Sequence, residues 1–169
     1  GPQYYVMAQL AWDPDQDARA ILDDYYRRGF GPAAVPVRAY FEMWEQARMA
    51  YVAEHGYEAG ALGLPKLYTD ELLRRADEQL RLAEEKAGGA PSVYRQRVQF
   101  VRAGLTWTRL AAENARLMGS YWRNKDEATG AKVRANWETM EQLCKENPYA
   151  VNWGPVRPST PRMLGLHPD

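Results

Sequence analysis

The chain has 169 residues, 46% of them hydrophobic, and its 22 Lys and Arg residues balance 22 Asp and Glu residues. A chain of this length and composition can bury one sizeable core, so a single domain is the default expectation. Zero net charge gives no field toward phosphate backbones, and apolar runs stay short of the roughly 18 residues that cross a bilayer. We therefore expect neither nucleic acid nor a membrane as a partner.

The first residues, GPQYYVMAQLAW, predict a short helix that is apolar over most of its circumference. Tyr4, Met7 and Leu10 recur at helical spacing on this segment. A helix of this kind needs cover on several sides, so we interpret residues 1–12 as the last helix of an upstream barrel domain. Tyr4, Met7, Leu10 and Trp12 are then the predicted inter-domain contacts.

A sharp corner follows this helix. Asp13 precedes Pro14, and a residue before proline is pushed out of the α region, so the helix ends there. Asp15 or Asp17 can cap the next helix by accepting hydrogen bonds from its first N–H groups. That second helix is expected to stop at a glycine with positive φ, Gly29. Its predicted apolar stripe consists of Ala18, Ile21, Leu22 and Tyr25.

Four longer segments continue the helical pattern. Pro32 or Pro36 opens the first, and the glycine-rich loop 55–68 separates it from a helix that Thr69 caps. The longest helix is expected from about 92 to 123, and the last one ends at Asn147. Expected inward positions are Val37, Tyr40, Phe41, Trp44, Tyr51, Leu72, Leu73, Ala76, Leu80, Ala83, Val93, Tyr94, Val98, Phe100, Val101, Gly104, Leu105, Trp107, Ala111, Ala112, Met118, Val133, Trp137, Met140 and Cys144.

These elements predict an all-α fold: an irregular helical bundle of about five main helices over residues 13–147. Residues 148–169 contain five prolines and no helical period, so they are expected to form an extended C-terminal tail. No strand pattern and no repeat occurs in the sequence.

No catalytic constellation is visible. His55 and His167 have no Cys or His at ligand spacing, so we expect no metal site and no cofactor. No nucleophile elbow is present, and the carboxylates lie beside Arg or at helix starts, where solvation and capping explain them. Cys144 cannot form an internal disulfide and falls on an apolar stripe, so it is expected to be buried and inert. It leaves open whether the compartment is cytoplasmic or extracytoplasmic.

Four residues are candidates for carbohydrate binding. Tyr149, Trp153 and Arg157 combine flat rings with a forked donor, groups that can stack on pyranose faces and hold acidic sugars. Trp122, at the end of the longest predicted helix, is the fourth candidate. The alternative is that Trp153 fills a groove of the bundle and that Arg157 pairs with a helix carboxylate.

The stretch YYVMAQLAWDPDQDARAILDDYYRRGFGPAAVPVRAYFEMWE resembles a junction known from bacterial α-glucuronidase-like proteins and other glycoside-hydrolase-like TIM-barrel proteins. In those proteins the catalytic barrel ends and the C-terminal helical region begins at this point. YRQRVQFVRAGLTWTRL, residues 94–110, is similar to the central helix of that region. The resemblance implies a helical module that buttresses the barrel, contributes a wall to the sugar cleft and takes part in dimerisation. The catalytic carboxylates of such enzymes lie on barrel loops, so no catalytic residue is implied here.

The leading hypothesis is a non-catalytic helical module of a carbohydrate-active protein that degrades polysaccharides. Its partners would be the upstream catalytic barrel domain, an oligo- or polysaccharide, and a second copy in a homodimer. The alternative is a free-standing helical protein–protein interaction domain that uses exposed rings as its partner surface. A small enzyme with a cleft between helices is the third hypothesis.

Overall fold

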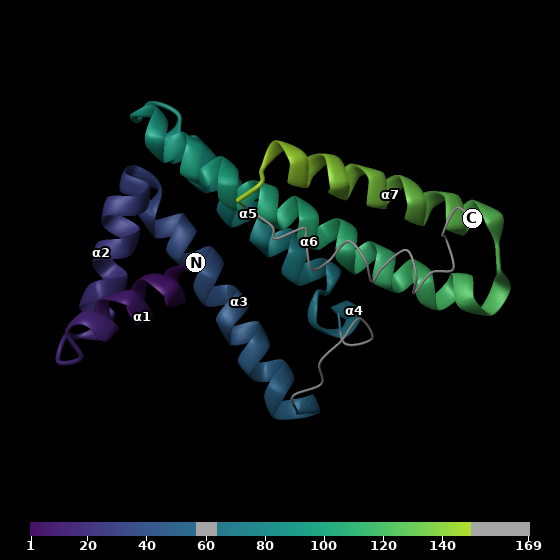
Figure 1. The fold of residues 1–169 in the computed structure, drawn as a ribbon, viewed down its shortest axis with the longest axis horizontal. Helices are drawn as coiled ribbons and strands as arrows, with labels where there is room; N and C mark the ends of the chain where they lie inside the picture. Colours follow the sequence, from purple (N-terminus) through teal and green to yellow (C-terminus); the bar gives the residue numbers. More distant parts are fainter. Residues whose placement is uncertain (57–63, 150–169) are drawn as a thin grey trace. The chain divides into compact units, whose positions relative to one another are not determined.

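The structure, a computed structural model, describes residues 1–56 and 64–149, and this part of the chain consists of helices joined by turns, without a strand. The all-α prediction is confirmed (Figure 1). No helix among the described residues is long and apolar enough to cross a membrane. In chain order the elements are α1 (Pro2–Trp12), α2 (Ala18–Phe30), the 3₁₀ turn η1 (Gly31–Ala33), α3 (Ala34–His55), α4 (Leu64–Leu67), α5 (Asp70–Ala87), α6 (Ser92–Asn124) and α7 (Glu127–Glu146).

The chain packs as two compact units, and three long helices contribute residues to both. The first unit comprises residues 1–46 and 75–99, and the second comprises residues 47–74 and the described residues from 100 onward. The predicted loop 55–68 is helical at its end, because Leu64–Leu67 form the single turn α4.

In the first unit, α1 lies against α2, and η1 joins α2 to α3. Asp17 is the N-cap of α2, and its carboxylate accepts from the backbone N–H of Arg19 at 2.8 Å. The prediction that α2 stops at Gly29 is wrong by two residues, because α2 runs to Phe30 and Gly31 takes the positive φ of 51°. Arg97 of α6 donates to the carbonyl of Gly29 at 2.9 Å, which satisfies an acceptor at this helix end.

Aromatic rings form the core between α2 and α3, which η1 joins into a helical hairpin. Tyr26, Phe30 and Tyr40 are buried, and the ring centroids of Tyr25 and Phe30 lie 5.9 Å apart with an edge-to-face orientation. Tyr26 and Phe41 connect α2 to α3 at 6.2 Å. Edge-to-face ring pairs add to the stabilisation that their buried area already gives.

In the second unit, α7 runs back alongside α6 (Figure 1). Lys125 makes the turn with a φ of 51°, and Asp126 caps α7 by accepting from the Thr129 N–H at 2.8 Å. Among the described residues, the polar residue that is buried is Asn114 of α6. Its Oδ1 accepts a hydrogen bond from the Asn136 amide of α7 at 3.0 Å. This part-buried amide pair favours one register between the two helices, because sliding one helix would leave the buried Asn114 oxygen without its donor.

Most predicted inward positions are buried. The stripe Leu72, Leu73, Ala76, Leu80 and Ala83 is fully confirmed, and Val133, Met140 and Cys144 of α7 are also buried. Val93 and Phe100 of α6 were expected inward and are instead 40% and 45% exposed. The apolar arc of α6 is therefore wider than the surface that its neighbours cover.

Candidate interaction site

One face of α1 is apolar and exposed along its full length. The exposed fractions of Tyr4, Met7 and Trp12 are 68%, 64% and 91%, and no residue of α1 is buried. Ala8 and Ala11 are exposed between them, which completes an i, i+3, i+4, i+7, i+8 stripe. We call these five residues the α1 stripe: Tyr4, Met7, Ala8, Ala11 and Trp12.

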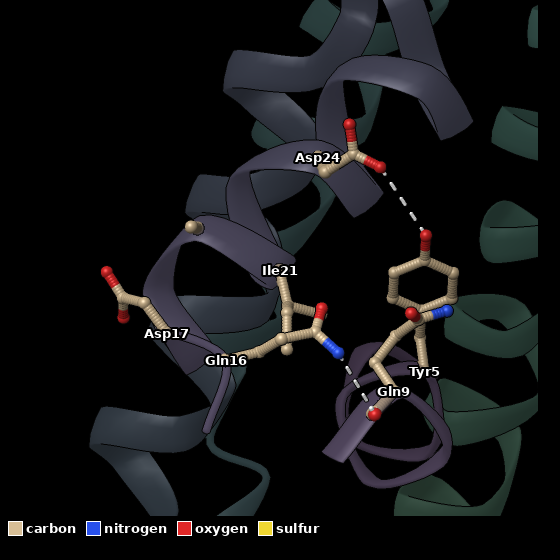
Figure 2. Close-up of a pocket in the computed structure, with 7 residues that line it drawn as sticks. Tyr5, Gln9, Gln16, Asp17, Ile21 and Asp24 are labelled. Atoms are coloured by element: carbon tan, nitrogen blue, oxygen red, sulfur yellow. Dashed lines mark hydrogen bonds between the residues drawn. The ribbon is translucent and has the colours of Figure 1, made fainter. Parts of the chain in front are cut away.

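Two polar side chains, Tyr5 and Gln16, attach α1 to α2 and to the turn that joins them. The ring of Tyr5 lies 5.3 Å from that of Tyr25, and its hydroxyl donates to the carboxylate of Asp24 at 3.5 Å. Figure 2 shows this contact together with a second one, in which the Gln16 amide donates to the carbonyl of Gln9 at 3.3 Å. Both contacts link α1 to the residues that follow it, and they leave the α1 stripe exposed.

A small groove lies between these two contacts. It has a volume of about 260 Å³, and its lining combines amides, carboxylates and a phenol with the aliphatic Ala20 and Ile21. Asp17 lies at its edge with the carboxylate directed away from Tyr5 (Figure 2). Asp24 also accepts from Arg27 and Arg28 at 2.6 and 2.7 Å, so its charge is already balanced. We therefore interpret the groove as part of the packing between α1 and α2.

The phenol groups of Tyr25 and Tyr26 on α2 stay neutral well above physiological pH. Burial raises the pKa of Tyr26 to about 12, and burial also raises the pKa of Tyr25. Arg38 of α3 lies over the Tyr26 ring and pairs with Asp23 of α2. The aromatic residues between α2 and α3 are thus uncharged, and the ion pair of Arg38 with Asp23 lies beside them.

Within the described residues no group of three His, Cys, Asp or Glu side chains could hold a metal ion. Cys144 is buried, and burial raises the pKa of its thiol, which disfavours the nucleophilic thiolate.

The predicted site residues fall in three places. Tyr4, Met7 and Trp12 belong to the exposed α1 stripe, whereas Leu10 is half-buried. Tyr149 follows the end of α7 and is 91% exposed. Trp153 and Arg157 lie outside the described residues, as does the side chain of Trp122, so these carbohydrate-binding candidates stay predictions.

Sequence reasoning missed the residues that shape the corner. Tyr5, Gln16 and Asp24 make its cross-helix contacts, and no short-range pattern marks a Tyr–Asp pair that is 19 residues apart. Ala8 could have been found, because it stands four residues after Tyr4 on the same helix face.

The corner coincides with the part of the chain that is similar to a known family. Residues 1–42, which span α1, α2, η1 and the first turns of α3, match a family model described as a domain of unknown function (DUF4838). No curated protein and no solved structure matches the chain.

Proposed function

We propose that this chain is a non-catalytic helical module whose α1 stripe packs against a second domain of the same polypeptide. We propose further that this domain is the catalytic barrel of a glycoside-hydrolase-like, polysaccharide-degrading protein, which the helical module buttresses. The observation that carries the proposal is the α1 stripe, an exposed and uncharged helix face.

The make-up of the stripe supports docking against protein. α1 carries neither an acidic residue in its first turn nor a basic residue in its last, and its exposed face offers Tyr4, Met7 and Trp12. Aromatic residues and Met are the types enriched in interfaces, and charged residues are depleted from interface centres. Contacts of Tyr5 and Gln16 hold the helix in place beforehand, so docking would require little ordering.

The size of the stripe favours a tethered partner. Large side chains such as Tyr, Met and Trp present about 150 to 250 Å² each when fully exposed, so the exposed fractions of Tyr4, Met7 and Trp12 offer about 300 to 550 Å² of accessible surface. Stable complexes between separate proteins bury about 800 Å² per partner. A partner in the same polypeptide meets the stripe at a high effective concentration, so a small contact is enough to hold it.

The carbohydrate context of the proposal rests on the resemblance of residues 4–45 to the junction between barrel and helical region in α-glucuronidase-like proteins. The family match over residues 1–42 supports the interpretation that the corner is a recurrent unit, although the description of that family names no activity. Tyr149 and the predicted candidates Trp122, Trp153 and Arg157 would contribute a wall of the sugar cleft.

Methionine oxidation tests the docking. Met7 on α1 and Met49 on α3 are exposed to nearly the same extent, 64% and 66%, so peroxide should oxidise both at similar rates in this chain. In the polypeptide that includes the reading frame upstream of Gly1, Met7 should oxidise at least about tenfold more slowly. Met49 is the matched control and should keep its rate, with both rates measured by mass spectrometry.

Three outcomes would contradict the proposal or redirect it. Equal oxidation rates at Met7 and Met49 in the longer polypeptide would contradict the docking of α1 against a second domain. A start codon close to Gly1 would contradict the proposal that a barrel domain precedes this chain. Protection of Met7 in this chain alone that grows with concentration would support the free-standing interaction domain or homodimer instead. Hydrolysis of a glycoside panel by the longer polypeptide, and not by this chain, tests the assignment to polysaccharide degradation.

A further inference from the structure

The middle of the α1 stripe carries two alanines between larger side chains. Residues 4, 7, 8 and 11 stand at i, i+3, i+4 and i+7 of one helix, so they are nearest neighbours on its surface, and all four are exposed. An alanine ends at Cβ, whereas the side chains of Tyr4 and Met7 extend well beyond that atom. We call these four residues the α1 tetrad: Tyr4, Met7, Ala8 and Ala11.

Large side chains stand one helical turn away on both sides of Ala8. Tyr4 precedes Ala8 by four residues, and Trp12, which is 91% exposed, follows it by four. A flat partner surface would contact Tyr4, Met7 and Trp12 and would leave both alanines uncovered. A partner with a side chain that protrudes at the centre would contact the whole stripe. The shape of the stripe therefore favours a protruding partner.

An α-helix presents side chains that fit such a face. When two helices pack, a side chain of one inserts among four residues of the other, and the tetrad has the spacing of such a set. Small residues at the contact let the helix axes approach to about 8 Å, the lower end of the usual range. With 11 residues, or about three turns, α1 is long enough for one insertion of this kind.

We propose that the α1 tetrad receives one large aliphatic or aromatic side chain from a helix of the second domain, which crosses α1 at Ala8 and Ala11. This inference rests on the proposed docking of α1, and it adds the type of element and the type of side chain that the partner supplies. The outer layer of a (β/α)₈ barrel consists of helices, so the barrel of the proposed function can provide this partner.

Enlarging the two alanines tests the inference. Ala8→Leu and Ala11→Leu each add apolar surface to an exposed position, so docking on a flat partner should be unchanged or stronger. A partner side chain inserted between the alanines would be displaced, and overpacking of this kind should weaken docking by about tenfold or more. The measurement is the oxidation rate of Met7 in the longer polypeptide, divided by its rate in this chain with the same substitution.

The protection of Met7 should fall from at least about tenfold in the parent to about twofold or less in either leucine variant. Ala135→Leu is the matched control, since Ala135 is an exposed alanine within α7 of the second unit, and it should leave the protection unchanged. Far-ultraviolet circular dichroism of this chain checks that each variant keeps its helices, which the exposure of all three alanines leads us to expect.

The outcomes separate this inference from the proposed function. Met7 that is protected equally in the parent and in both leucine variants would overturn the helix crossing and leave the docking intact. Met7 that is unprotected in the parent polypeptide would contradict the docking and this inference together. An equal loss of protection with Ala135→Leu would show a general effect of added leucine and would also overturn the inference.

Discussion

The connection between α2 and α3 depends on Gly31, and replacing it with alanine should destabilise the chain. Gly31 has φ 51° and ψ −120°, a region that residues with a Cβ rarely adopt. Holding such a conformation costs about 1 to 3 kcal/mol. A Cβ at this position would also lie 2.8 Å from two carbons of the Tyr94 ring, closer than real Cβ contacts allow.

The expected loss for Gly31→Ala is about 2 to 4 kcal/mol, because displacement of the Tyr94 ring adds about 1 kcal/mol or more to the backbone cost. Gly29→Ala is the matched control two residues away. Gly29 lies within α2, and a Cβ there would have nothing within 4 Å. Its replacement should stabilise the chain by up to about 1 kcal/mol, because alanine is the better helix former.

Urea unfolding followed by far-ultraviolet circular dichroism measures both changes. A double-mutant cycle of Gly31→Ala with Tyr94→Ala separates the two contributions to the lost stability. Removal of the Tyr94 ring should relieve the steric clash and leave only the cost of the backbone conformation. A Gly31→Ala variant as stable as the parent chain would refute the positive φ and, with it, the geometry of the hairpin.

Two further predictions concern the core and the α6–α7 interface. Leu80→Ala should cost about 2 to 5 kcal/mol in the same assay, because Leu80 is fully buried. A loss below about 1 kcal/mol, which is typical of a surface substitution, would contradict its burial. Glu113→Gln should destabilise the chain at neutral pH and lose its effect in acid. Its contact with Lys132 lowers the pKa of Glu113 in the folded chain, so the stabilisation is present above the ordinary pKa of a carboxyl and is lost as the pH falls through the lowered value. A difference between parent and variant that stays constant from about pH 7 to about pH 3 would count against that contact.

Helix boundaries followed closely from local patterns. Proline after Asp13 ended α1, Thr69 accepts from the Leu72 N–H at 3.2 Å as a cap should, and the alternation of Leu72, Leu73, Ala76 and Leu80 marked the buried face of α5. Such features act over one turn of helix, so the residues involved are neighbours in the sequence. The choice between Asp15 and Asp17 as the cap of α2 needed the structure, because both can accept and only the backbone path selects one.

The candidate sites were harder to predict. Tyr4, Met7 and Trp12 were singled out because their helix was apolar, and the structure adds that they share an exposed face with Ala8 and Ala11. The contact of Arg116 with Asp70 was not predicted, since the two residues are far apart in the sequence and no local pattern relates them.

What the sequence by itself determined is the set of helices, their ends and most of their buried stripes, because capping, proline geometry and apolar periodicity act locally. Only the tertiary structure decided which apolar residues remain exposed, as with Phe100 and the α1 stripe, and which polar side chains meet, as with Tyr5 and Asp24 or Arg116 and Asp70. Exposure and contact depend on how helices distant in sequence pack against one another, and a helical period is the same whether or not a neighbour covers it.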